Sequence, residues 1–412
     1  MTQRILTLIV IFLVLDLYVW FGTRNSFSNT NWAMAYKIFY ISSAVLGYIG
    51  LAVLFTVFRD RSISPTFAQN VLMGFSFAFF IFKLVAGIFL IIDDVVRLIQ
   101  YVYNFAAQLF KSEEKTVPLH ERRQFIVKSG LALASIPFAS MLFGITKGKY
   151  WYTIKNIPLT YNSLPKAFSG FKVVQISDVH AGSFDSKEDV ARGIKMINDL
   201  NPDVILFTGD LVNNKADEIE PYIDLFSSLN AKYGKFSTLG NHDYGDYVKW
   251  ESDEAKQANM NKLFGLHKKM GFDLLNNENR QIQKDGEFIN IIGVENWGRP
   301  PFPQHGNLDQ ALVGVQPEEF NILMSHDPTH WSMKVIENPM PIELTLSGHT
   351  HGMQFGVEIP GWKWSPVKYI YKNWAGLYEK DEQKLYVNRG FGFLGFPGRV
   401  GMWPEITLIE LS

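Results

Sequence analysis

The stretch Ser347-Gly348-His349-Thr350-His351-Gly352 sets two histidines one residue apart, with a glycine on either side of the trio. It comes after the apolar run Pro341-Ile342-Glu343-Leu344-Thr345-Leu346, which predicts a buried strand. Glycine permits the backbone turns that let both imidazoles reach one point. A His-x-His pair at a strand end often binds nothing, so its meaning depends on the residues at the ends of the neighbouring strands.

Four further strand-like runs end in residue types that ligate metals. In chain order, 171–176 leads into Ser177-Asp178-Val179-His180, 203–208 into Gly209-Asp210, 235–239 into Gly240-Asn241-His242-Asp243, and 320–324 into Ser325-His326-Asp327. Open sheets bind ligands at the carboxyl ends of their strands, so these side chains are expected to converge. The sequence therefore predicts one site built of carboxylate, imidazole and amide groups.

The order of these motifs, from Asp178 to His351, resembles that of the calcineurin-like metallophosphoesterase superfamily. More narrowly, it resembles the membrane-anchored, bacterial-type branch, whose members carry membrane or export segments before the catalytic domain. The resemblance covers roughly residues 150–412. Met353 departs from it, because the branch has Gly-His-Thr-His-Gly-Gly-Gln, with glycine at this position. The departure concerns the lip of the pocket and leaves the metal ligands in place.

The resemblance implies two divalent metal ions and assigns their ligands. One metal would be held by Asp178, His180 and His351, the other by Asn241, His326 and His349, and Asp210 would bridge the two. Mixed oxygen and nitrogen ligands suit manganese, iron or zinc alike. Two metals ~3.5–4 Å apart can activate water for phosphate ester hydrolysis, which needs no serine or cysteine nucleophile. Consistent with this, the chain has no cysteine and no Gly-x-Ser-x-Gly elbow.

The resemblance also implies catalytic roles for three further residues. His242, next to the ligand Asn241, would be the general acid, since a histidine of pKa near ~6.5 can donate a proton at neutral pH. Asp243 would orient His242, and a cap or turn is the alternative role. Arg389, in Asn388-Arg389-Gly390, would either contact substrate phosphate or pair with a carboxylate.

Residues 1–146 are expected to form a helical transmembrane region of about four spans. The apolar segments are 5–21, 36–58, 71–92 and 125–145. Each approaches the ~20 residues that cross a bilayer. Asp16 and Lys83 lie inside such segments and are expected to pair with each other. A cleaved signal peptide is the alternative interpretation of the first segment, but the next stretch is another apolar segment instead of a globular sequence.

The basic residues predict an integral protein of a bacterial inner membrane, with its catalytic domain outside the cytoplasm. Those that support this orientation are Lys111, Lys115, Arg122 and Arg123, and those that oppose it are Arg59, Arg61, Lys147 and Lys149. The pair Arg122-Arg123 either begins a twin-arginine-like export signal or anchors the cytoplasmic end of the fourth span. Both interpretations place the domain on the same side.

The region 150–412 is expected to be the catalytic domain, with an α/β fold. Helical patterns at 186–200, 218–229 and 250–270 alternate with strands, and shorter strands come next at 280–283 and 288–294. This predicts two sheets packed face to face with helices outside, and the resemblance implies the same four-layer αββα sandwich. The helix at 250–270 is mostly polar and is expected on the surface. Surface or capping roles are expected for the other histidines, His120, His267, His305 and His330.

The net charge and the residue content limit the classes of binding partner that we expect for this protein. A net charge of −1 and a pI near 6.8 give no reason to expect nucleic acid, which would favour a basic surface. The sequence carries no signal for an oligomeric state. Two aromatic stretches, 297–303 and 362–378, either fill a core of the domain or, if exposed, form a surface suited to lipid.

Two classes of function are compatible with these features. The first is a membrane-anchored phosphoesterase that cleaves phosphodiester or pyrophosphate bonds, with lipid-linked or envelope precursors as candidate substrates. The second is a non-catalytic membrane sensor or scaffold that retains the metal-binding fold. The complete ligand set together with His242 favours the enzyme, because a retired site should have lost at least one of these residues.

Overall fold

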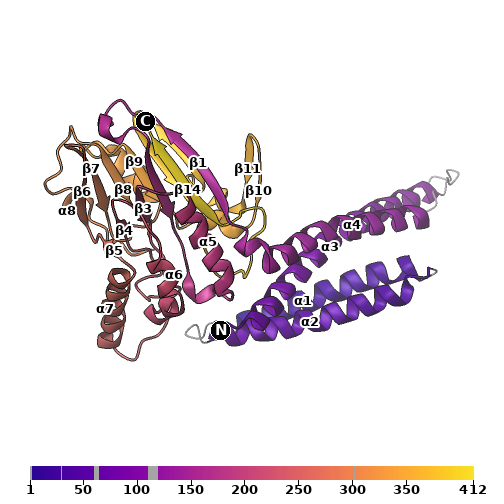
Figure 1. The fold of residues 1–412 in the computed structure, drawn as a ribbon. Helices are drawn as coiled ribbons and strands as arrows, with labels where there is room; N and C mark the ends of the chain where they lie inside the picture. Colours follow the sequence, from indigo (N-terminus) through magenta and orange to yellow (C-terminus); the bar gives the residue numbers. More distant parts are fainter. Residues whose placement is uncertain (1, 29, 60–64, 110–118, 301) are drawn as a thin grey trace. The chain divides into compact units, whose positions relative to one another are not determined.

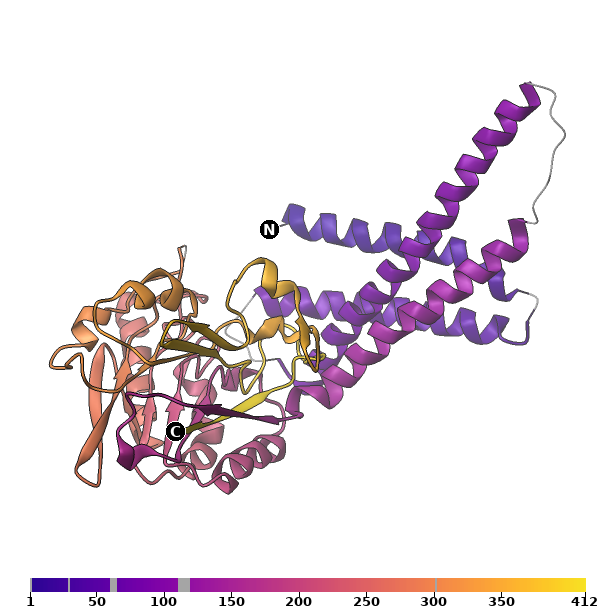
Figure 2. The same cartoon turned by 90° about the horizontal axis from the view of Figure 1, so that it is seen from above.

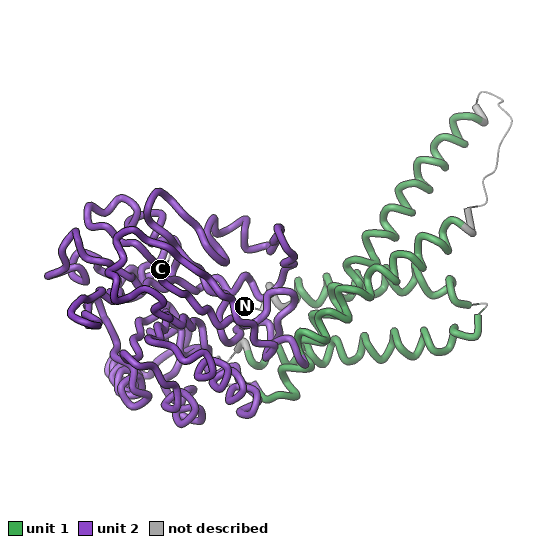
Figure 3. The backbone as a smooth tube through the Cα atoms, turned by 45° about the horizontal axis from the view of Figure 1, so that its top comes forward, with its two compact units in different colours: residues 1–59, 66–145 green, residues 60–65, 146–412 purple. Residues whose placement is uncertain are grey.

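The computed structural model describes residues 2–28, 30–59, 65–109, 119–300 and 302–412, and it divides into two compact units (Figure 3). Unit 1 comprises Met1–Arg59 and Thr66–Ile145, and unit 2 comprises Asp60–Pro65 and Thr146–Ser412. Of the basic residues that entered the orientation argument, Arg61, Lys111 and Lys115 lie outside the described residues. The side chain of His120 is likewise outside the description.

The secondary-structure elements found in the described residues of unit 1 are all helices. Its elements are α1 (Thr2–Thr23), η1 (Arg24–Phe27), α2 (Ala33–Arg59), α3 (Phe67–Leu109) and α4 (Leu119–Thr146). Within the described ranges, four stretches are long and apolar enough to span a membrane: 6–27, 33–57, 67–107 and 122–146. The four expected segments are therefore confirmed as helices of spanning length. With 43 residues, α3 is ~65 Å long at ~1.5 Å per residue, about twice the hydrocarbon thickness of ~30 Å.

The two ionisable residues expected to pair inside this unit do so. Lys83 Nζ lies 3.1 Å from Asp16 Oδ1, and both side chains are buried. Tyr40 donates a hydrogen bond to Asp16 Oδ1 at 3.1 Å, and the Lys83 ammonium lies 4.6 Å from the centre of the Phe79 ring. Charges inside a bilayer are costly, so mutual pairing within the helix bundle explains how both are tolerated.

Unit 2 contains two six-stranded sheets and one two-stranded hairpin (Figures 1 and 2). The first sheet has the order β1-β14-β2-β3-β4-β5, with β1 (Thr153–Leu159), β14 (Glu405–Leu411), β2 (Phe171–Ile176), β3 (Val204–Phe207), β4 (Lys235–Ser237) and β5 (Phe272–Leu274). The second has the order β12-β13-β9-β8-β7-β6, with β12 (Gly376–Lys380), β13 (Gln383–Val387), β9 (Leu344–Ser347), β8 (Asn321–Met324), β7 (Glu287–Gly293) and β6 (Glu278–Lys284). The hairpin pairs β10 (Val357–Ile359) with β11 (Trp362–Trp364).

Helices and short 3₁₀ turns connect the strands. The α-helices are α5 (Lys187–Asp199), α6 (Ile223–Ser227), α7 (Asp253–Lys269), α8 (Leu308–Ala311) and α9 (Thr329–Met333). The 3₁₀ turns are η2 (Gly148–Tyr150), η3 (Lys166–Phe168), η4 (Ala181–Ser183), η5 (Ala216–Tyr222), η6 (Val335–Glu337), η7 (His351–Gln354) and η8 (Pro366–Tyr369). α5 begins where its sequence predicts, because Ser186 Oγ accepts a hydrogen bond from the Asp189 N–H.

Strand side chains alternate between two apolar layers. In β2, Val173 belongs to the core between the two sheets, whereas Val174 belongs to the core under α5, α6 and α7. In β8, Ile322 faces the core between the sheets and Leu323 faces α8 and α9. The result is the predicted four-layer αββα sandwich, preceded in the chain by apolar helices.

The expectation of surface or capping roles was wrong for two histidines, although the polar helix at 250–270 is largely exposed, as expected. The helix predicted at 250–270 is α7, but its residue His267 is fully buried, with Nδ1 3.0 Å from Ser237 Oγ. His330 is also buried, with Nδ1 2.8 Å from Ser325 Oγ. A polar helix still buries one face, and His267 lies on that face. His305 is exposed, as expected.

The burial of His267 predicts acid sensitivity. Burial lowers the pKa of His267 to about 3, against 6.5 for an ordinary histidine. Since the folded-state pKa is the lower one, this stability is complete above pH 6.5 and is lost as the pH falls toward 3. At pH 5 the loss is about 2 kcal/mol relative to pH 7. His267→Phe should therefore flatten the fall in unfolding temperature between pH 7 and pH 5. His305→Phe should not, and an equal fall in all three proteins would contradict the assignment.

Candidate metal centre

The predicted ligands lie where the parallel strands of both sheets end. Strands β2, β3 and β4 run parallel in the first sheet, and β7, β8 and β9 in the second. Asp178, Asp210 and Asn241 come within four residues after β2, β3 and β4, and His326 and His349 come two residues after the ends of β8 and β9. Parallel strands place their carboxyl ends at one edge, so the two sheets bring these residues together.

Three residues of the first predicted ligand set form a compact group. The ligand atoms of Asp178, His180 and His351 all lie within 4.8 Å of one another. His351 Nε2 lies 3.2 Å from Asp178 Oδ1 and 3.0 Å from His180 Nε2. All three residues are buried. Two imidazoles and a carboxylate converging on one point are a donor set that fits a divalent transition metal.

A second compact group consists of Asp178, Asp210 and His326. His326 Nε2 lies 3.1 Å from Asp210 Oδ2 but outside hydrogen-bonding geometry. Its Nδ1 lies 2.7 Å from Thr208 O, and because a carbonyl only accepts, Nδ1 carries the proton and Nε2 faces the centre. Asp210 Oδ2 is also 3.5 Å from His180 Nε2. Asp210 thus lies between a ligand predicted for one metal and a ligand predicted for the other.

The remaining predicted ligands, Asn241 and His349, contact each other. His349 Nδ1 lies 2.8 Å from Asn241 Oδ1, and the Asn241 amide group donates to Tyr247 OH at 2.8 Å. The rings of His349 and His326 meet edge to face with centres 5.2 Å apart. This contact joins the pair to the second group.

The backbone at the site is strained. Asp178, His180, Asp210, His349 and His351 have φ between 47° and 70°, in the left-handed region that residues other than glycine rarely adopt. Such conformations persist only where the surrounding structure enforces them, and they concentrate at functional sites.

Burial and charge set the protonation of the site. Burial raises the pKa of Asp178, but the neighbouring His351 outweighs it and holds this pKa below its usual value. Burial lowers the pKa of His180 well below its ordinary range. For His326, burial favours the neutral ring, but the adjacent Asp210 carboxylate raises the pKa to about 10. A metal at this position would displace the His326 proton, since ligand binding requires a neutral imidazole.

His242 is placed to carry a proton. Its Nδ1 lies 2.8 Å from Asn213 O, so Nδ1–H donates to this carbonyl and Nε2 remains available. Its backbone N–H donates to Asp210 Oδ1 at 2.8 Å, and its ring packs edge to face against that of His180. His242 is half-buried at the centre, beside the predicted bridging carboxylate.

Asp243 organises the loops instead of contacting the His242 ring. Its Oδ2 accepts hydrogen bonds from the N–H groups of Gly240 (2.8 Å) and Asp210 (2.9 Å). Its Oδ1 accepts from Leu211 (2.8 Å). None of the hydrogen bonds found in the described parts of the chain joins Asp243 to the His242 ring, which is held by Asn213 O instead. Burial, and then the charge of Asp210, raise the pKa of Asp243 to about 7.

This arrangement predicts how Asp243→Asn will behave. The amide turns one acceptor oxygen into a donor facing backbone N–H groups, and each buried donor left unsatisfied costs about 1–3 kcal/mol. The loop that carries Asp210 should shift, so we expect lower metal content together with a lower unfolding temperature. Asp246→Asn, at an exposed position in the same loop, is the control. A variant with full metal content and only a slower reaction would support the expected role toward His242.

Arg389 pairs with carboxylates, which is the alternative to phosphate contact that its sequence leaves open. Its Nη1 donates to Glu405 Oε2 at 2.5 Å and its Nη2 to Glu358 Oε1 at 2.8 Å. The residue is buried. Glu405 begins β14 and Glu358 lies in β10, so Arg389 links the hairpin to the first sheet.

Sequence reasoning missed three residues that position the histidines. Arg399 is fully buried with Nη2 3.1 Å from His351 Nδ1, and Tyr371 OH lies 2.8 Å from His349 Nε2. Asp327 Oδ2 lies 3.6 Å from the same His349 nitrogen. The aromatic stretch around Tyr371 was a signal for it, and Asp327 comes directly after a motif histidine. Nothing in the sequence around Arg399 marks it.

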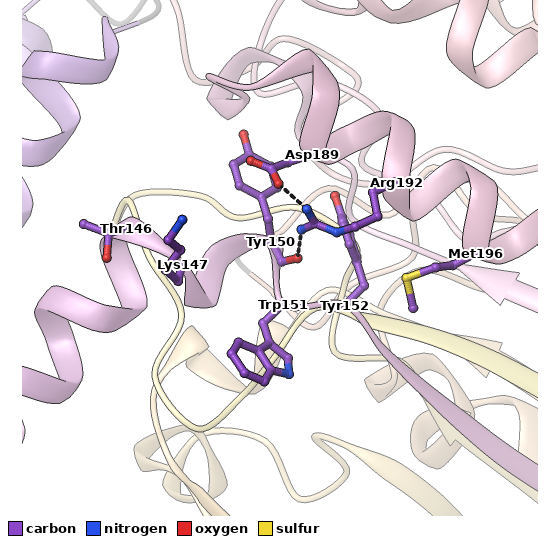
Figure 4. A pocket seen from close by; sticks show the side chains of 8 residues that line it. All are labelled: Thr146, Lys147, Tyr150, Trp151, Tyr152, Asp189, Arg192 and Met196. Carbon is purple, nitrogen blue, oxygen red and sulfur yellow. Dashed lines mark hydrogen bonds and ion pairs between the residues drawn. The ribbon is translucent and has the colours of Figure 1, made fainter.

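A separate cavity of about 350 Å³ lies at the beginning of unit 2 (Figure 4). It is lined by Thr146, Lys147, Tyr150, Trp151, Tyr152, Asp189, Arg192 and Met196. The Arg192 guanidinium donates hydrogen bonds to Asp189 Oδ1 and to Tyr150 O. None of the predicted metal ligands lines this cavity, so it is distinct from the metal centre.

Family models match both parts of the chain. Residues 171–353 match the model described as calcineurin-like phosphoesterase. Residues 3–149 match the model described as "Probable Calcineurin-like phosphoesterase, transmembrane domain". The first match contains all the predicted metal ligands, and the second contains the four apolar helices.

Curated relatives carry the same description. The Bacillus subtilis protein "Uncharacterized metallophosphoesterase YkuE" is 32% identical over 257 residues, which cover 60% of this chain and 82% of that protein. A zebrafish "Transmembrane protein with metallophosphoesterase domain" is 27% identical, covering 66% of this chain and 60% of its own length. An "Uncharacterized metallophosphoesterase" of Campylobacter jejuni is 25% identical, covering 92% of this chain and 90% of that protein.

The fold, the site at the strand ends and the matches to family models and relatives together define the class: a metallophosphoesterase-type protein. The chain belongs to the calcineurin-like phosphoesterase family, in the form that joins the phosphoesterase domain to a helical transmembrane domain. Membership of this family supports a phosphate ester hydrolase that binds divalent metal. The four apolar helices and the match to the transmembrane model support an integral membrane protein.

Proposed function

We propose that the chain is a dinuclear-metal phosphoesterase that hydrolyses phosphodiester or pyrophosphate bonds, with lipid-linked or envelope precursors as candidate substrates. The observation that carries the proposal is the convergence of buried carboxylate and imidazole ligands from five strand ends beside His242. Asp178, His180 and His351 would hold one metal, Asn241, His326 and His349 the other, and Asp210 would bridge them. The buried nitrogen His326 Nε2, which faces the centre without a hydrogen-bond partner, supports a site that is completed by an ion.

The chain's own residues would share the remaining work. When bound, two divalent metals supply counter-charge for the phosphoryl oxygens and lower the pKa of water from ~15.7 to roughly 7. His242 keeps one nitrogen on Asn213 O and would donate its other proton to the departing oxygen. Asp243 holds the loop around Asp210, and Arg399 and Tyr371 orient His351 and His349.

The test is hydrolysis by the purified full chain in detergent, with a chromogenic phosphodiester and the matching monoester. We expect turnover that disappears with a chelator and returns with manganese, iron or zinc. The diester-to-monoester ratio then defines the substrate class. A chain that carries two metals per molecule but hydrolyses neither these compounds nor a phospholipid would favour the sensor or scaffold instead.

We further propose that unit 2 lies on the non-cytoplasmic side of a bacterial inner membrane, because the larger basic cluster, Lys111, Lys115, Arg122 and Arg123, would then remain in the cytoplasm. A reporter that is active only outside the cytoplasm, fused after Lys149, should be active. An active cytoplasmic reporter at the same position, with a silent external one, would reverse the orientation.

A further inference from the structure

The hairpin β10–β11 has its apolar side outward. Directly opposed residues of an antiparallel pair share a face, so Val357, Ile359, Trp362 and Trp364 lie on one side of it. Val357, Ile359 and Trp362 are exposed by 45%, 55% and 53%. Such a face on a small hairpin is normally buried against a core, so its exposure calls for a partner.

The polar side of the same hairpin packs on the body of unit 2. Glu358 accepts hydrogen bonds from Arg389, and Lys155 Nζ lies 3.4 Å from the same carboxylate. Lys363, opposite Glu358, donates to Ala375 O and lies 5.4 Å from the centre of the Trp374 ring. The body therefore holds the hairpin by its polar face and directs the apolar face away.

The apolar face continues into the next turn. In η8 and just after it, Tyr369 and Ile370 are exposed by 75% and 56%. The Trp364 indole N–H lies 3.5 Å from Tyr369 OH, which connects this turn to the hairpin. We call these residues the apolar rim: Val357, Ile359, Trp362, Trp364, Tyr369 and Ile370. Tryptophan, tyrosine and aliphatic side chains with lysines nearby form the composition of a membrane–water interface.

The rim adjoins the point where the chain leaves its last apolar helix. Helix α4 ends at Thr146, and Gly148 packs so closely on Trp403 and the Arg399 carbonyl that an added Cβ would lie 2.6 and 2.5 Å from them. The segment after Arg399 pairs with the start of the hairpin, because Gly356 N–H donates to Val400 O at 2.9 Å. These contacts all lie within unit 2, and the hairpin projects from the sheets of this unit (Figure 1).

The rim is also tied to the metal centre. Tyr371 comes directly after Ile370, and its hydroxyl group is hydrogen-bonded to His349 Nε2. Ser365 Oγ donates a hydrogen bond to Gly352 O at 2.8 Å. Met353, where the branch has glycine, holds a left-handed φ of 56° and exposes 49% of its side chain. In the sequence, an apolar side chain thus occupies a strained position between His351 and the first residue of the rim.

We propose that the apolar rim docks on the bilayer that holds the chain's own helices and enters it at the level of the lipid headgroups. The four apolar helices belong to the same chain, so unit 2 is tethered to a bilayer whenever those helices are inserted. Docking does not require turnover. Its consequence, that phosphate esters of membrane lipids reach the metal centre without leaving the bilayer, rests on the proposed function.

Single-cysteine labelling of the full chain tests this, because the natural sequence contains no cysteine. Ile359→Cys and Tyr369→Cys would each carry an environment-sensitive fluorophore in vesicles of phosphatidylcholine and phosphatidylglycerol. Val313→Cys, 72% exposed in the segment between α8 and β8, is the matched control. Unchanged metal content in each variant shows that the domain is folded.

At positions 359 and 369 we expect blue-shifted emission, several-fold weaker quenching by iodide than at 313, and strong quenching by lipids labelled near the headgroup. Position 313 should show the converse. Iodide quenching at 359 and 369 equal to that at 313 would overturn the proposal. Shielding from iodide without quenching by labelled lipid would also overturn it, because a second copy of the chain or another protein would then cover the rim.

Discussion

Asp210→Asn should empty at least one metal position and lower hydrolysis by roughly 10³-fold or more, since a lost metal removes several kcal/mol of transition-state stabilisation. The Asp210 carboxylate faces both His180 and His326, at 3.5 and 3.1 Å. An amide carries no charge and cannot bind two ions through two equivalent oxygens. The measurement is metal per chain by elemental analysis, alongside the rate on a phosphodiester.

The substitution is chosen so that the fold survives. Asp210 has φ of 60°, and asparagine is one of the few residues that tolerate this conformation. The remaining amide oxygen can still accept the His242 N–H. Asp217→Asn makes the same chemical change at an exposed position of unit 2 and should alter neither metal content nor rate. Two bound metals and an undiminished rate in the Asp210 variant would refute the bridging assignment.

His242→Asn should slow the reaction by ~10²–10⁴-fold, the usual contribution of general acid–base catalysis, without loss of metal. The asparagine side chain can preserve the bond to Asn213 O but has no titratable nitrogen. The loss should be largest for esters with poor leaving groups, and small for a nitrophenolate that departs without a proton. Rates for a series of leaving groups, with metal content measured on the same samples, check this.

His305→Asn is the control for this variant, because His305 is an exposed histidine whose ring packs on Tyr244. It should leave both the rate and the leaving-group dependence unchanged. If His242→Asn lowered all rates equally and released metal, His242 would be a structural support of the centre instead of its acid.

These predictions begin from strand ends that the sequence already marked. The runs before Asp178 and Asp210 are mostly apolar and bounded by glycine or polar turns, so these strands were predictable from local pattern alone. The seven proposed ligands come from the resemblance of their motifs, and the structure brings them to one edge. The pairing of Asp16 with Lys83 was predictable for another reason, since a bilayer leaves few options for isolated charges.

Other features required contacts between distant segments. The sequence around Asp243 leaves a cap or turn role open beside that of an orienting carboxylate, and only the folded loops show it binding neighbouring backbone N–H groups. His267 reads as a surface residue on a polar helix, but the packing of α7 on β4 buries it against Ser237. Arg399 contacts His351 across 48 residues, and no local signal encodes that distance.

By itself the sequence determined the order of elements, the apolar segments of membrane-spanning length and the residue types at each strand end, because these depend on periodicity, length and local chemistry. Only the tertiary structure decided which atoms face the centre, that Arg389 is held by two glutamates, and that the hairpin shows its apolar face to the outside. Those outcomes depend on how two sheets and their loops meet. Neighbours in space are fixed by packing the whole domain, and no short stretch of sequence contains that information.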